Sequence, residues 1–169
     1  MLEIFNRLKL FFEDNYVRIN VREYARLQKI SPPHASTVLK RLEKESLLLK
    51  KEERGYHFFY ANREEPLFVK LQQAYYQQKL KELIYYLEEE FAAPLVILFG
   101  SLARAEVSRN SDIDLAVFSA TKKKVNLKKF EELYGREVQL FTFGSRKELN
   151  KNEELLNNIL GGAVLSGSW

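Results

Sequence analysis

An unbroken apolar run from Leu95 to Phe99 is followed directly by Gly100 and Ser101. The run predicts a buried strand, which Pro94 separates from the helical pattern before it. Glycine lets the backbone turn sharply and leaves room for a ligand, while serine supplies a hydroxyl at the start of a helix, where free amides and the helix dipole favour phosphate. The pair therefore predicts a phosphate-binding turn, although an ordinary helix cap has the same sequence.

A second strand is predicted from Asp112 to Phe118, and two carboxylates interrupt its apolar sequence. Asp112 and Asp114 point to the same face because residues i and i+2 of a strand share a face. Two like charges held so close favour a cation between them, and Mg²⁺ or Mn²⁺ suits oxygen ligands. The chain has no cysteine and two histidines, so thiolate or histidine-rich metal sites are not expected. A solvated pair of aspartates at a strand end is the alternative.

The order of strand, Gly-Ser turn, helix, loop and Ser-Asp-Ile-Asp-Leu strand resembles the minimal nucleotidyltransferases of the DNA polymerase β superfamily. The residues that match this pattern are Gly100, Ser101, Ala103, Arg104, Ser111, Asp112 and Asp114. Ala105 departs from the pattern, because many relatives have glycine there. The resemblance implies an α+β fold over residues 92–169, with a mixed sheet flanked by helices.

The resemblance also implies roles for these residues. Gly100, Ser101 and Ser111 would bind a nucleoside triphosphate, and Asp112 and Asp114 would hold the divalent metal. Arg104 would be either a further phosphate ligand or a structural clamp. The implied reaction is metal-dependent transfer of a nucleotidyl group to a hydroxyl of a protein or nucleic acid.

A third carboxylate, which in active relatives lies on a later strand and accepts a proton, is missing from its usual place. Aligning Gly135 to Leu140 with the family's strand puts Gln139 there, and an amide does not take up a proton. Glu137 lies two residues earlier on the same predicted face and is the candidate to replace it as catalytic residue and metal ligand. Two hypotheses follow: an active nucleotidyltransferase that uses Glu137, or a catalytically degenerate domain that senses nucleotide.

Residues 1–61 predict a separate unit with three helices and a hairpin. Asn20 can cap a helix from Val21 to about Lys29, and Ser31-Pro32-Pro33 can start the next. Strands are expected at 47–51 and 56–61. This order resembles the winged helix-turn-helix domains of prokaryotic transcription regulators. A long helix over 62–91 would link it to the second domain.

The winged-helix resemblance implies that residues 1–61 bind duplex DNA. This segment holds 12 Lys and Arg against 8 Asp and Glu, whereas residues 62–169 hold 15 against 15, and a local basic excess favours phosphate contacts. A protein-docking module is the alternative. The DNA-contacting residues would be His34, Ser36, Thr37, Lys40 and Arg41 on the recognition helix and Arg54 in the wing.

The remaining expectations concern location and partners. No run of about 18 apolar residues and no signal peptide is present, which predicts a cytoplasmic protein with no membrane partner. The resemblance to minimal nucleotidyltransferases implies a helical partner protein, and a homodimer formed through the long helix would suit a two-fold DNA site. A transcription regulator whose nucleotidyltransferase fold is degenerate remains the non-enzymatic alternative.

Overall fold

The chain is seen here in a computed structural model that describes residues 2–121 and 123–168. It divides into two compact units. The first comprises Met1–Gln72 and Ala105–Arg109, and the second comprises Gln73–Arg104 and Asn110–Trp169. The chain therefore returns to the first unit for five residues after it has begun to build the second.

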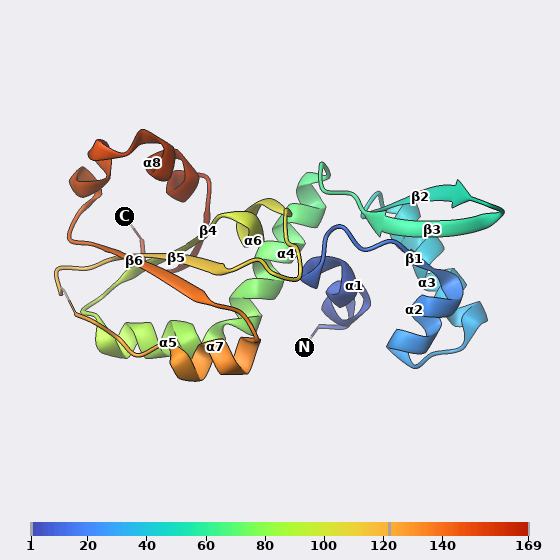
Figure 1. Cartoon of the computed structure of the whole chain (residues 1–169), viewed down its shortest axis with the longest axis horizontal. Coiled ribbons are helices and arrows are strands. Elements are labelled where there is room, and N and C mark those ends of the chain that lie inside the picture. The colour runs from blue at the N-terminus through green and yellow to red at the C-terminus, as the bar shows by residue number, and fades with distance from the viewer. Residues whose placement is uncertain (1, 122, 169) are drawn as a thin grey trace. The chain divides into compact units, whose positions relative to one another are not determined.

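The first unit contains helices and a small antiparallel sheet (Figure 1). Its strands have the order β1-β3-β2, with β3 paired to both neighbours. The two-residue strand β1 has no signal in the sequence, whereas the hairpin of β2 and β3 was expected. The elements are α1 (Glu3–Glu13), β1 (Ile19–Asn20), α2 (Val21–Gln28), α3 (Pro32–Lys44), β2 (Leu48–Glu53) and β3 (Tyr56–Ala61).

Both predicted caps of α2 and α3 are confirmed. The Glu23 backbone N–H donates to Asn20 Oδ1 at 3.0 Å, and the Asn20 N–H donates to Glu23 Oε2 at 3.1 Å. These reciprocal bonds form a capping box, which satisfies two backbone donors at the helix start. Ser31 accepts from the His34 N–H at 3.4 Å, and Pro32 occupies the first position of α3. The two helix starts therefore follow from local sequence.

The core of the first unit is aromatic and aliphatic. Phe12 of α1 packs against Phe68 with ring centroids 5.2 Å apart, and both side chains are fully buried. Phe68 lies on α4 (Pro66–Lys79), so the start of this helix belongs to the first unit. Other fully buried members of this core are Leu8, Phe11, Ala35 and Leu39.

The expectation of one long helix over 62–91 is wrong, because two helices occupy this segment. The second is α5 (Lys81–Glu90), and Leu80 between them has φ −90° and ψ 9°, outside the helical region. No glycine or proline marks the break. Leu80 is fully buried, so packing at this position, which the local pattern does not encode, accompanies the departure from helical geometry.

The second unit is built on a four-stranded mixed sheet of order β6-β5-β4-β7. The pairs β4·β5 and β4·β7 are antiparallel, and β5·β6 is parallel. The final strand forms from residues 163–166, for which no strand was expected. The elements after α5 are β4 (Leu95–Phe99), α6 (Ser101–Arg104), β5 (Ile113–Phe118), α7 (Lys128–Tyr134), β6 (Val138–Phe143), a 3₁₀ helix η1 (Arg146–Lys151), α8 (Glu153–Leu160) and β7 (Ala163–Ser166).

Helices cover both faces of this sheet (Figure 1), with α8 on one side and α5 and α7 on the other. All five residues of β4 are buried, as predicted for a strand covered on both faces. One core cluster joins alternate β4 and β5 residues to Ile159 of α8, and it contains Leu95, Ile97, Phe99, Ala116 and Phe118. The α+β class expected from the sequence is confirmed. Within the described ranges, no helix is long and apolar enough to cross a membrane.

Candidate functional site

The turn after β4 brings the backbone of Gly100 against the carboxylate of Asp114. Gly100 has φ +69°, a conformation that residues with a Cβ rarely adopt. A Cβ placed there would lie 2.2 Å from Asp114 Oδ2 and 3.1 Å from its Cγ. Glycine is therefore required twice, for the backbone conformation and for the close approach of the carboxylate.

The helix that starts at Ser101 is a single turn. It ends at Arg104, and Ala105 follows in the left-handed region with φ 58°. A macrodipole needs several aligned peptide units, so one turn adds little to anion binding. Phosphate affinity at this turn would have to come from nearby N–H groups and from the partly exposed Ser101 hydroxyl.

Asp112 directly precedes β5 and Asp114 is its second residue, so the two side chains share one face of the strand. Asp114 is directly opposite Phe99, the last residue of β4, in the antiparallel register. Burial of the Asp114 carboxyl, and secondly the charge of Asp112, raise its pKa to about 6. Because the neighbouring charge of Asp112 disfavours ionisation of Asp114, a cation bound between them would be stabilising.

Gln139 lies where the sequence alignment expected a third carboxylate in active relatives. In the parallel register of β5 and β6 it lies opposite Asp114, and its Nε2 donates to Asp112 Oδ2 at 2.8 Å. An amide thus stands beside the two carboxylates, as the alignment of the sequence predicted. The hydrogen bond itself was not foreseen, because it depends on the register between two strands far apart in the chain.

Glu137 is exposed and precedes the first residue of β6. Its backbone carbonyl accepts from the Ile113 N–H at 2.9 Å, which extends the pairing of β6 with β5 by one bond. Across residues 2–121 and 123–168, no three Asp, Glu, His or Cys side chains gather as a metal-binding group. The structure therefore does not bring Asp112, Asp114 and Glu137 together as the expected three-carboxylate site.

The other expected nucleotide ligands have protein partners. Arg104 donates through Nη2 to Asn158 Oδ1 on α8. The Ser111 carbonyl accepts from Arg136 Nη1. Arg136 was not among the candidate residues, although it lies in the segment that leads into β6 and fixes the backbone just before Asp112.

Comparison with known families identifies this part of the chain. Residues 81–162 match the family described as Polymerase beta, Nucleotidyltransferase. This segment is a polymerase β-like nucleotidyltransferase domain. No curated protein and no solved structure matches the chain. The matched range of the nucleotidyltransferase domain runs from α5 to the end of α8 and contains the Gly-Ser turn, both aspartates, Glu137 and Gln139.

The residues expected to contact DNA lie on α3 and in the β2–β3 turn. His34, Thr37 and Lys40 are exposed, whereas Ser36 is partly buried. Thr37 Oγ1 donates to the Pro33 carbonyl at 3.1 Å, a bond within the helix. Arg54 is exposed in the hairpin turn with φ 52°.

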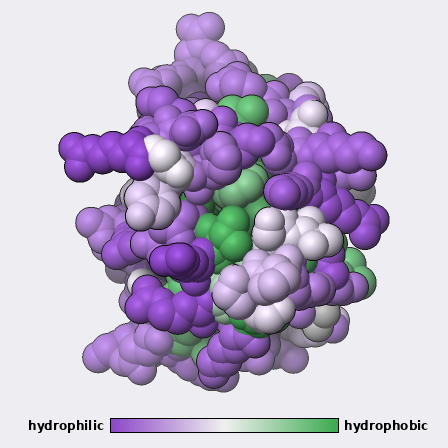
Figure 2. Space-filling view, turned by 90° about the vertical axis from the view of Figure 1, so that its right-hand side faces the viewer, coloured by the Kyte–Doolittle hydropathy of each residue, from purple (hydrophilic) through white to green (hydrophobic). Residues whose placement is uncertain are grey.

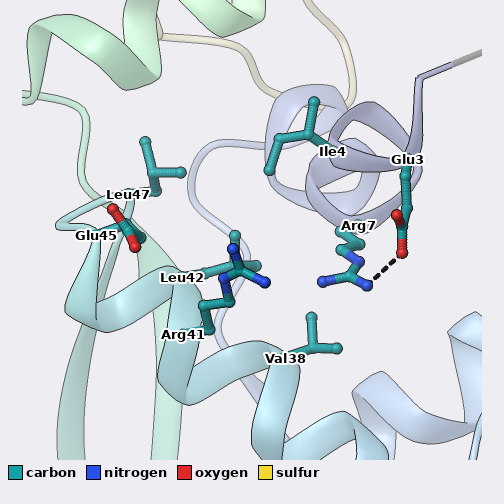
Figure 3. Close-up of a pocket in the computed structure, with 8 residues that line it drawn as sticks. All are labelled: Glu3, Ile4, Arg7, Val38, Arg41, Leu42, Glu45 and Leu47. Carbon is teal, nitrogen blue, oxygen red and sulfur yellow. Dashed lines mark hydrogen bonds and ion pairs between the residues drawn. The ribbon is translucent and has the colours of Figure 1, made fainter.

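Arg41 is exposed but also lines a pocket of about 340 Å³ formed by α1, α3 and the start of the hairpin (Figure 3). Arg7, which is paired with Glu3, extends into the same pocket from α1. Val38, Leu42 and Leu47 supply buried apolar parts of the wall. The side chains of Arg41 and Lys40 therefore lie on different parts of the surface, since Lys40 is not among the residues that line this pocket.

Proposed function

We propose that the nucleotidyltransferase domain binds a nucleoside triphosphate together with Mg²⁺ or Mn²⁺. The observation that carries this proposal is the packing of Gly100 against Asp114, with Asp112 on the same strand face. The turn offers a backbone free of side-chain bulk for the phosphates, and the two carboxylates offer oxygen ligands for the metal.

The donor set fits one divalent cation. Asp112 and Asp114 supply the oxygen ligands, and a cation would offset the burial and the Asp112 charge that together raise the pKa of Asp114. A bound cation would neutralise triphosphate charge and favour displacement at phosphorus. The amide oxygen of Gln139 could add a neutral ligand, but its charge does not replace that of a carboxylate.

Nucleotidyl transfer requires that an acceptor hydroxyl oxygen bond to the α-phosphorus as the bond to pyrophosphate breaks and the hydroxyl proton leaves. Gln139 occupies the position from which a carboxylate would take that proton, and an amide is not a base at neutral pH. We therefore favour nucleotide sensing without efficient turnover. Nucleotidyl transfer is the second candidate; the family match over residues 81–162 supports it, and it would need another base, for which Glu137 is the candidate.

Metal-dependent binding is tested by isothermal titration of the full chain with a non-hydrolysable nucleoside triphosphate and Mn²⁺. The proposal expects saturable binding that requires the metal. The double variant Asp112→Asn, Asp114→Asn should abolish it, whereas Glu132→Gln, an exposed carboxylate on α7, should bind like the parent chain. Equal affinity of the aspartate variant and the parent would refute the proposed site.

Turnover is tested separately by incubation with nucleoside triphosphates labelled at the α-phosphate, Mg²⁺ or Mn²⁺ and cell extract. Sensing without turnover predicts no protein or nucleic acid labelling above that of the double aspartate variant. Labelling by the parent chain that disappears in Glu137→Gln would instead establish transfer with Glu137 as the base.

For residues 1–61 we propose a winged helix-turn-helix that binds duplex DNA. Three helices followed by a hairpin support this proposal, together with exposed Lys40 and Lys44 on α3 and the basic excess of this segment. The face of the first unit shown in Figure 2 is largely hydrophilic, with a small apolar area near its centre. Combined with nucleotide binding, this role suggests a regulator that reads DNA and responds to nucleotide.

DNA binding is tested by fluorescence anisotropy with random-sequence duplex at several salt concentrations. Each phosphate contact contributes about 0.9 to the slope of log affinity against log salt. Lys40→Ala, Lys44→Ala should reduce both affinity and slope, whereas Lys128→Ala, an exposed lysine on α7, should change neither. Unchanged binding in the α3 variant would favour the protein-docking alternative.

A further inference from the structure

The first unit contains a buried asparagine that holds a distant segment of the chain. Asn15, 2% exposed, follows α1. Its Oδ1 accepts from the Val107 N–H at 2.6 Å, and its own N–H donates to the Val107 carbonyl at 2.8 Å. One residue thus satisfies both backbone groups of Val107, as a strand partner would.

Asn15 is itself fixed by two further bonds. Its Nδ2 donates to the Phe11 carbonyl at 2.7 Å and to Gln72 Oε1 at 2.6 Å. Gln72 is fully buried. Buried hydrogen-bonded polar groups specify one arrangement strongly, because any other leaves a donor or acceptor unsatisfied away from water. Asn15 is therefore tied to the core of the first unit on one side and to Val107 on the other.

The segment that Asn15 holds connects the two arms of the proposed nucleotide site, which are the Gly100-Ser101 turn and the carboxylates of Asp112 and Asp114. Ala105–Arg109 belongs to the first unit, yet in the chain it follows the Gly-Ser turn with α6 and precedes Asp112. Val107 is fully buried, and Arg109 also forms an ion pair with Asp14 at 3.4 Å. The first unit therefore fixes the middle of the connection between the phosphate turn and the carboxylates.

We propose that Asn15 is a positioning residue for the nucleotide site and couples nucleotide binding to the state of the first unit. This inference rests on the proposed nucleotide binding. With Val107 fixed, the chain on both sides of it is restricted, and so is the placement of Asp112. By reciprocity, nucleotide that orders the two arms also stabilises the Asn15–Val107 pairing.

The test compares Asn15→Leu with Asn62→Ala. Leucine resembles asparagine in size but leaves the buried Val107 N–H without its side-chain acceptor. Asn62 is the control, because it is an asparagine of the same unit whose side chain bonds a different segment. Its Nδ2 donates to the Ser46 carbonyl at 2.8 Å. The dissociation constant for Mn²⁺ and a non-hydrolysable triphosphate should rise at least about fivefold in Asn15→Leu, as for a typical coupling between sites. It should change less than about twofold in Asn62→Ala.

Hydrogen exchange of the full chain supplies a readout that needs no ligand. Exchange in residues 105–114 should accelerate in Asn15→Leu and not in Asn62→Ala, and in the parent chain nucleotide should slow exchange in residues 11–18. If Asn15→Leu folds poorly, Val107→Ala loosens the same segment in another way, because it removes buried packing at the residue that Asn15 bonds, and it should show the same changes to a smaller degree.

The possible failures are distinct. Absence of nucleotide binding by the parent chain would refute the proposed function, and the ligand-free exchange would then decide whether Asn15 positions residues 105–114. Unchanged exchange in residues 105–114 of both Asn15→Leu and Val107→Ala would overturn the positioning role. Nucleotide binding to these variants at parental affinity would overturn the coupling.

Discussion

The side-chain amide of Gln139 donates a hydrogen bond to the carboxylate of Asp112 across the parallel pair β5·β6, at 2.8 Å. This contact gives Asp112 a neutral donor where a third carboxylate would share a metal with it. In the proposed site the pair would therefore separate metal binding from proton acceptance, because an amide at this position accepts no proton.

Restoring a carboxylate at this position should strengthen metal binding. Gln139→Asp places a third negative oxygen ligand beside Asp112 and Asp114, and Mn²⁺ affinity should rise at least about tenfold because affinity follows the charge of the ligand set. Titration monitored by Mn²⁺ paramagnetic resonance measures this change. Gln139→Asn, which has the same length and no charge, is the control, and equal affinities for the two variants would contradict the expectation.

Without metal, the ionisation of Asp114 should lower the stability of the folded chain. Its pKa is raised to about 6 from 3.8, so between these values the folded state binds more protons than the unfolded state. Stability from this group is present below about pH 3.8 and is lost as the pH rises through about 6. Asp114→Asn should therefore raise the melting temperature clearly at pH 8 and little at pH 4, with Glu132→Gln as control. A difference that did not depend on pH would contradict this.

A methyl group at position 100 should disrupt the site. Gly100→Ala combines a left-handed residue with a contact of 2.2 Å to Asp114 Oδ2, and should destabilise the fold by about 2–5 kcal/mol. Gly135→Ala is a matched control, because Gly135 has φ +63° but no atom within 4 Å of the place where the added methyl would lie, and should cost about 1–2 kcal/mol. Urea unfolding measures both, and equal losses would show that the Asp114 contact has no effect.

Lys40 and Arg41 should differ in their effect on DNA binding. Lys40 is exposed on α3, whereas Arg41 lines the pocket shared with Arg7. Lys40→Ala should lower the salt slope by about 1, the loss of one phosphate contact, and Arg41→Ala should lower it less. Anisotropy with the same duplex compares them, and a larger loss for Arg41→Ala would place Arg41 on the DNA-contacting surface.

Features set by local sequence were predictable. The caps at Asn20 and Ser31 and the buried strand β4 depend on a few neighbouring residues, and so does the turn at Gly100. The α+β class followed from the order of these elements, and the spacing of Gly100, Ser101, Asp112 and Asp114 predicted the nucleotidyltransferase domain that residues 81–162 match.

Features set by contacts between distant parts of the chain were not predictable from the sequence. β1 and β7 are short and form only because β3 and β4 offer them a paired edge. The break at Leu80 has no glycine or proline to mark it. The Asn15–Val107 pairing joins residues 92 positions apart, and no local pattern indicates that these two residues bond each other.

The return of Ala105–Arg109 to the first unit has a consequence for synthesis on the ribosome. At about 5–20 residues per second, several seconds separate the emergence of Gln72 from that of Val107. During this interval Asn15 lacks its backbone partner, although the three helices and the hairpin are already complete. The nascent N-terminal unit thus lacks both Val107 bonds until part of the nucleotidyltransferase domain has been translated, and a chain truncated before residue 105 would remain in that incomplete state.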